Sequence, residues 1–103
     1  MLNVSAAALR ASLGDAAPPP HLRDELVALW HDGRGDWARA HEAVQDVETP
    51  AAAWVHAYLH RKEGDLGNAR YWYARAGQPA CATSLDAEWE AIVSALGDTA
   101  SAS

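Results

Sequence analysis

The sequence has no phenylalanine, one methionine and one cysteine among its 103 residues. With Cys81 alone, a disulfide within the chain is excluded. Lys and Arg together number 8 against 14 Asp and Glu, which gives a formal net charge of -6. Phosphate binding needs clustered basic side chains, and this chain has no such cluster. We therefore expect no nucleic-acid partner.

Long apolar runs are also missing, because the longest extend over only a few residues. A membrane-spanning helix needs about 20 consecutive apolar residues, so no membrane partner is expected. The N-terminal segment lacks the basic start and apolar centre of a signal peptide. These features favour a cytoplasmic protein, and the length suits a single domain over residues 1–103.

What the chain does contain is helical periodicity, and its abundant alanine disfavours strands. The clearest pattern is the stretch 54–77, WVHAYLHRKEGDLGNARYWYARAG, in which apolar residues recur three and four positions apart. Gly64 can end a first helix in the left-handed conformation, and Asp65 can cap a second. Thr49 followed by proline is typical of a helix start. We expect a helical hairpin over about residues 50–77.

A second hairpin is predicted over about residues 21–48, because a shift of 29 residues places Gly35-Asp36 on Gly64-Asp65. A leading helix is expected over residues 2–13, with Leu9 and Leu13 on one face. A last helix is expected over about residues 84–97 and should cover the second hairpin as a capping helix. Thr83, with an acidic residue three positions later, resembles a capping box for that helix. Residues 98–103 are expected to be disordered.

The predicted fold class is all-α, and the repeat is similar to the tetratricopeptide family. The spacing of small, aromatic and glycine positions carries this resemblance, at Ala57, His60, Gly64, Ala69, Tyr73 and Ala76. It implies two antiparallel helical hairpins between a leading and a capping helix. The period of 29 residues departs from the 34 residues usual in the family. The stretch HAYLHRKEGD…NARYWYARAG also resembles small uncharacterised bacterial proteins, which implies a fold and no chemistry.

The chain has five tryptophans and no phenylalanine, and each of the last five predicted helices contains one tryptophan. Trp30, Trp37 and Trp89 lie at apolar positions of the pattern and are expected in the core. Trp54 and Trp72 correspond to positions where the first hairpin has no large side chain. They are expected to pack against the terminal helix or to lie on a surface, since large aromatics most often serve cores.

The favoured functional interpretation is a module that binds a protein or a peptide. Stacked hairpins leave a concave groove lined by the first helix of each pair, which can receive a peptide or a partner helix. The groove is expected at the central hairpin, with Trp54 and His56 at its floor. The candidate binding residues are His31, Trp54, His56, His60 and Trp72.

The alternative is a small metal-binding protein or enzyme that uses His56, His60 and Glu63. These residues follow one side of a helix at i, i+4 and i+7, and imidazole nitrogens bind divalent metals. The arrangement is not the HExxH pattern of metalloproteases. The same histidines could instead fill positions between helices and hydrogen-bond there. On balance we expect neither a resident metal nor a cofactor.

No residue is selected as catalytic. Nothing in the sequence places a base beside Cys81, and no serine lies in a nucleophile-elbow pattern. A third possibility is a structural subunit that self-associates through Trp54 or Trp72. The oligomeric state stays open at this stage.

Overall fold

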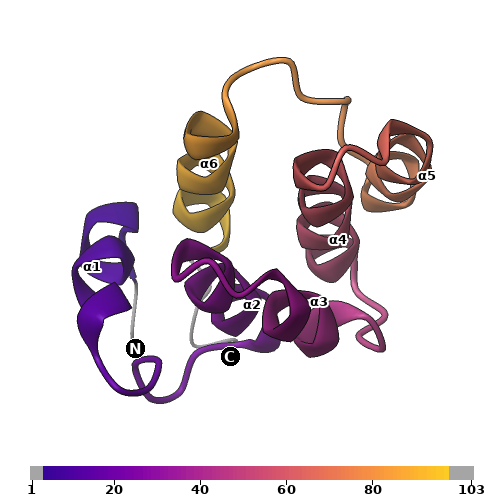
Figure 1. Ribbon diagram of the computed structural model, residues 1–103. Coiled ribbons are helices and arrows are strands. Elements are labelled where there is room, and N and C mark those ends of the chain that lie inside the picture. Colours follow the sequence, from indigo (N-terminus) through magenta and orange to yellow (C-terminus); the bar gives the residue numbers. More distant parts are fainter. Residues whose placement is uncertain (1–3, 98–103) are drawn as a thin grey trace.

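The computed structural model describes residues 4–97, in which six α-helices and one 3-10 turn account for all regular structure (Figure 1). None of these helices combines the length and the apolar character that a membrane span requires. The predicted all-α class and the order of the helices are confirmed. The expectation of disorder at 98–103 falls outside the described residues. The elements are α1 (Ala6–Ala11), the 3-10 turn η1 (Ser12–Gly14), α2 (Asp24–Gly33), α3 (Trp37–Val44), α4 (Pro50–Lys62), α5 (Leu66–Ala76) and α6 (Leu85–Gly97).

The two glycine-aspartate turns have the conformations that the sequence predicts. Gly35 has φ 80° and Gly64 has φ 90°, both in the left-handed region. Asp36 and Asp65 then cap α3 and α5, and each side chain accepts a hydrogen bond from a backbone N–H three residues later. These turns fold α3 back onto α2 and α5 back onto α4.

Helix starts are set by local caps, and one of them differs from the prediction. Thr49 caps α4 by accepting from the Ala52 N–H, with proline at the first helical position. The cap of α6 is Ser84, whose Oγ accepts from the Ala87 N–H at 3.1 Å. The prediction that Thr83 forms this cap is wrong, because its hydroxyl lies 3.0 Å from the sulfur of Cys81.

α6 lies against the two helices that were expected to line the groove. α6 packs against α4, α2 and α1, whereas α5 packs chiefly against α4 (Figure 1). Trp89 of α6 is 3% exposed, and its indole N–H donates to the Leu29 carbonyl at 2.9 Å. α6 therefore covers the first helices of both helix pairs, α2 and α4, and not the second pair alone.

Three buried carboxylates join helices that are distant in sequence. Each accepts one hydrogen bond from a hydroxyl and one from a basic side chain, so its charge is balanced without solvent. These contacts fix α2 against α4 and α6 against the α4–α5 pair. Glu25 accepts from Thr49 (2.6 Å) and Arg23 (2.9 Å). Asp32 accepts from Tyr58 (2.7 Å) and Lys62 (2.9 Å). Glu88 accepts from Tyr73 (2.5 Å) and Arg61 (2.7 Å).

Candidate metal centre

Three histidines converge where α3 meets α4. His41 comes from α3, and His56 and His60 lie one turn apart on α4. The Nε2 atoms of His41 and His56 are 2.9 Å apart. One potential ligand atom from each of the three rings lies within 4.8 Å of the others. Because α3 belongs to the first helix pair and α4 to the second, this cluster joins the two pairs.

Trp37 positions His41 for this contact. It lies one turn before His41 on α3, and the two rings stack with centroids 4.9 Å apart. The indole N–H of Trp37 also donates to the Leu59 carbonyl of α4 at 2.8 Å. This hydrogen bond anchors α3 against α4 at the level of the cluster, so His41 faces the histidines of α4.

His56 is enclosed by flat rings on both sides. Trp72 of α5 stacks on it with a centroid separation of 4.0 Å, and His60 stacks on it at 4.8 Å. As a result His56 is only 5% exposed. The side chain of His60 is 12% exposed, and His41 is partly exposed. The cluster is thus largely withdrawn from water, with His41 at its more open side.

The surroundings favour uncharged imidazoles. Burial, together with the neighbouring His41 and His60, lowers the pKa of His56 to about 4. Burial and the nearby His60 also lower the pKa of His41, and the attraction of Glu63 does not offset them. Both rings are therefore neutral at pH 7. A neutral imidazole keeps a lone pair on one nitrogen, which is the form that binds metals.

Glu63, expected above as a third metal ligand, has a different position. Its Oε2 lies 2.7 Å from Nδ1 of His60, so the carboxylate accepts a hydrogen bond from that nitrogen. The hydrogen bond orients the His60 ring and leaves Nε2 with the free lone pair. Histidines that bind metals commonly donate their other N–H to a carboxylate in this way. Glu63 thus supports a ligand and does not itself join the three-histidine cluster.

The spacing of the three rings is close to what a tetrahedral metal requires. Zn–N bonds of 2.0–2.1 Å place two coordinating nitrogens about 3.3 Å apart. The His41–His56 distance of 2.9 Å must therefore widen by about 0.4 Å. The longest nitrogen separation, at most 4.8 Å, must close by up to about 1.5 Å. Metal binding would require ring rotations of this size, and the ring whose Nε2 donates the His41–His56 hydrogen bond would have to carry its proton on Nδ1 instead.

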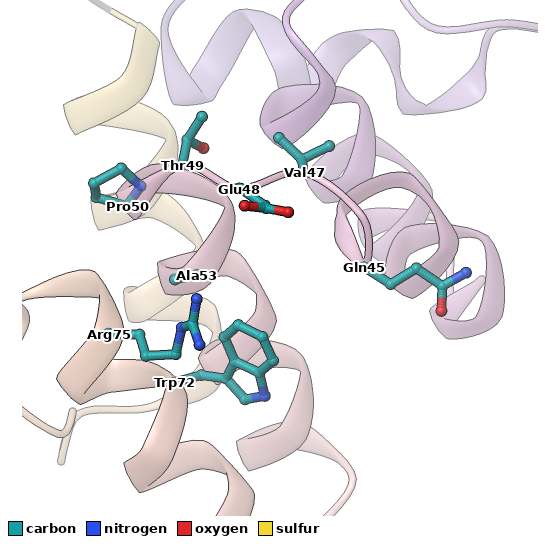
Figure 2. A pocket seen from close by; sticks show the side chains of 8 residues that line it. All are labelled: Gln45, Val47, Glu48, Thr49, Pro50, Ala53, Trp72 and Arg75. Atoms are coloured by element: carbon teal, nitrogen blue, oxygen red, sulfur yellow. The ribbon is translucent and has the colours of Figure 1, made fainter.

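Of the other predicted binding residues, Trp72 stacks on His56, whereas His31 lies against Trp30. Trp54 is half-buried and packs against both hydrophobic clusters of the core. His31 lies edge-on against Trp30 and lines different cavities from Trp72. Trp72 lines a cavity of about 260 Å³ between the α3–α4 connection and α5 (Figure 2). The guanidinium of Arg75 lies 5.2 Å from the Trp72 ring in this cavity.

Sequence reasoning found two of the three clustered histidines and missed His41. The repeat gave no signal for it, because the shift of 29 residues places His41 on Arg70. The available signal was the position of His41 one turn after Trp37, in the helix that precedes the histidine pair. Only the packing of α3 against α4 turns that proximity into a three-residue cluster.

Comparison with protein-family models, with curated proteins and with solved structures gave no match in any of the three. The function therefore has to be inferred from the geometry of the cluster and its surroundings.

Proposed function

We propose that this protein binds a divalent transition-metal ion through His41, His56 and His60. The observation that carries the proposal is the convergence of three imidazole ligand atoms within 4.8 Å, from helices of two different helix pairs. Two histidines on one helix are common without a metal. A third ring that meets them from another helix, with two pKa values lowered, is a far more specific arrangement.

The donor set favours particular metals. Three imidazoles without a thiolate suit Zn²⁺, Cu²⁺, Ni²⁺ and Co²⁺, whereas Ca²⁺ and Mg²⁺ prefer oxygen ligands. Within residues 4–97, the only carboxylate hydrogen-bonded to one of the three rings is Glu63, at Nδ1 of His60. We infer a site for a borderline metal such as Zn²⁺, in place of the metal-free protein that the sequence favoured.

Metal binding would connect the two helix pairs. His41 reaches the site from α3, and the other two ligands come from α4. A metal bound only by the folded chain stabilises it by RT ln(1 + [L]/Kd), which is about 2.7 kcal/mol at a hundredfold excess over Kd. For a domain of this size that corresponds to a rise in Tm on the order of 10 °C.

The test compares His41→Gln with His31→Gln by calorimetric titration and thermal unfolding with Zn²⁺. Glutamine at position 41 keeps a hydrogen-bonding group for His56 but is a poor ligand for a borderline metal. We expect the wild type to bind one Zn²⁺ and to melt at a higher temperature. His41→Gln should lower the affinity by about 100-fold or more, since outer-shell changes alone cost 10–100-fold. His31→Gln should bind as the wild type does.

The competing explanation is that His41 and His56 form only a structural hydrogen bond. In that case neither the wild type nor His31→Gln would be stabilised by Zn²⁺. Stabilisation that survives in His41→Gln would equally contradict the proposal, because it would place the metal on α4 alone or at another surface. Circular dichroism of each variant, without metal, establishes that the fold is retained.

A second candidate function is binding of a helical polypeptide, with the two helix pairs stacked as in tetratricopeptide repeats. The observation that favours it is on α5, where Leu66 is 55% exposed and Tyr71 is 53% exposed. Large apolar side chains exposed on one helix are a common feature of interaction surfaces. A protein retained from lysate by the wild type, then purified and titrated, should bind the double variant Leu66→Ser/Tyr71→Ser at least tenfold more weakly. Equal binding would contradict this candidate.

A further inference from the structure

A metal at the three-histidine centre has one coordination position that no described side chain fills. Zn²⁺ in proteins takes four ligands, and the cluster supplies three. In residues 4–97, the other group of potential ligands combines His60 with Glu63 and Asp65. Glu63 is engaged by Nδ1 of His60, and Asp65 caps α5 through the backbone N–H of Asn68. No fourth His, Cys, Asp or Glu of residues 4–97 therefore joins the three histidines, which leaves this position open to a ligand from outside.

The charge of the centre selects the kind of ligand. Neutral imidazoles leave the double positive charge of the metal uncompensated among its direct ligands. The surroundings are mostly rings, with Trp37 stacked on His41 and Trp72 stacked on His56. In such a poorly hydrated environment a dication attracts a negative ligand more strongly than it would in water. An anion is thus favoured over a neutral molecule.

We propose that the metal-loaded centre binds a small exogenous monoanion, of the size of azide, bicarbonate or hydroxide, at this fourth position. The inference rests on the proposed function, because it requires a metal on the three histidines. It goes further by assigning an open coordination position and a ligand class to the site. A closed, purely structural metal site would have no such position.

Access and size both favour a small ligand. His41 is partly exposed at the more open side of the cluster. The cavity in Figure 2 begins one helical turn from two of the histidines, because Gln45 follows His41 by four residues and Ala53 precedes His56 by three. Its volume of about 260 Å³ is below that of pockets for drug-sized ligands and holds a small anion together with several water molecules.

The experiment loads the protein with Co²⁺, whose visible absorption reports the number and type of its ligands, and then titrates sodium azide. Appearance of a visible spectrum with one Co²⁺ per chain tests the metal site itself. A saturable change of that spectrum with one azide per Co²⁺ tests the open position. Sodium chlorate or perchlorate at equal ionic strength controls for general salt effects.

A second arm uses Glu63→Gln at saturating Co²⁺. Loss of the carboxylate should weaken Co²⁺ binding by about 10–100-fold, because it orients His60. It should tighten azide binding by roughly three- to tenfold, because it removes a nearby negative charge. A general loosening of the site would weaken both, so opposite changes distinguish an electrostatic effect on a bound anion from structural damage.

The results of these titrations distinguish failure of the metal site from failure of the anion position. One Co²⁺ bound per chain with a spectrum unchanged by excess azide would overturn the anion inference and leave the metal site standing. Absence of Co²⁺ and Zn²⁺ binding would overturn the proposed function and the inference together. A change produced equally by perchlorate, or azide binding weakened in Glu63→Gln, would also count against a specific anion position.

Discussion

His56 is 5% exposed, and the titratable groups closest to it are two other imidazoles. Protonating it would place a positive charge among rings with no carboxylate in direct contact. The fold therefore stabilises the neutral form, which is also the form that coordinates a metal. The same residue thus links two measurable properties of the protein, its stability at acid pH and its affinity for metal.

The low pKa of His56 predicts how the stability of the metal-free protein depends on pH. The pKa of His56 is about 4 in the folded state against an ordinary value of 6.5. The unfolded chain therefore binds the proton more readily between those two values, and stability is lost as the pH falls through that window. Urea unfolding with chelator present should show a loss of roughly 3 kcal/mol from this group between about pH 7.5 and pH 4.

His56→Gln isolates that contribution, because glutamine does not titrate. The variant should lose less stability on acidification than the wild type, by roughly the same 3 kcal/mol. Other groups add to the total in both proteins. Among them is Glu25, whose carboxyl is buried but whose pKa is held below its ordinary value by hydrogen bonds from Thr49 and Arg23. Equal losses in the two proteins would contradict the account of His56.

The turn glycines give a second prediction at this scale. Alanine at Gly35 or Gly64 would have to adopt φ of 80° or 90°, so each substitution should cost about 1 kcal/mol in the free energy of unfolding. Gly67 is a matched control, because it lies in α5 with open space around it. Gly67→Ala should leave stability unchanged or raise it by up to about 1 kcal/mol. Destabilisation of the same size at all three sites would contradict the role of the turns.

At the level of helices, α6 is held on α4 and α5 by Glu88. This carboxylate is 2% exposed and accepts hydrogen bonds from Tyr73 at 2.5 Å and from Arg61 at 2.7 Å. Burial, followed by the hydrogen bond to Glu88, raises the pKa of Tyr73, so its hydroxyl stays protonated and donates. The Tyr73–Glu88 hydrogen bond thus joins α5 to the terminal helix α6.

Tyr73→Phe should therefore destabilise the protein by about 1–3 kcal/mol, since it leaves a buried carboxylate oxygen without its donor. The control is Tyr71→Phe, two residues away on the exposed face of α5, where the ring is 53% exposed. Its effect should stay within about 0.5 kcal/mol. Chemical denaturation of both variants makes the comparison, and a neutral Tyr73→Phe would contradict a stabilising role for the Tyr73–Glu88 hydrogen bond.

The sequence predicts the features of this fold that depend on neighbouring residues, but not those that depend on contacts between distant segments. Helix ends and turns are local, so Thr49, Asp65 and Gly64 identify them correctly. The packing of α6 and the approach of His41 depend on contacts between distant segments, which no local pattern encodes. His41 was missed as a member of the three-histidine cluster for that reason. The local prediction that Thr83 caps α6 was wrong, because the next residue, Ser84, forms that cap.

At the level of the whole molecule, the histidine cluster lies at the contact between two helix pairs. α3 packs chiefly against α2 and α4, whereas α4 also packs against α5 and α6. A metal that joins His41 to α4 should therefore restrict α3 most. We infer that metal binding acts on the relative positions of the helix pairs as well as on the site itself.

Hydrogen exchange with and without Zn²⁺ tests this inference. The amides of α3 should exchange more slowly in the metal-loaded protein, with a larger change than those of α6, which contributes no ligand. In His41→Gln the protection of α3 should disappear. Protection confined to α4 would instead indicate a metal held by His56 and His60 alone.

The central claim is that three histidines from two helices share one metal ion. X-ray absorption at the zinc edge of the Zn²⁺-loaded protein tests it most directly, because it counts imidazole ligands and measures their distances. The account predicts three imidazole nitrogens at about 2.0–2.1 Å, falling to two in His41→Gln. Two imidazoles in the wild type, or a spectrum that His41→Gln leaves unchanged, would contradict it.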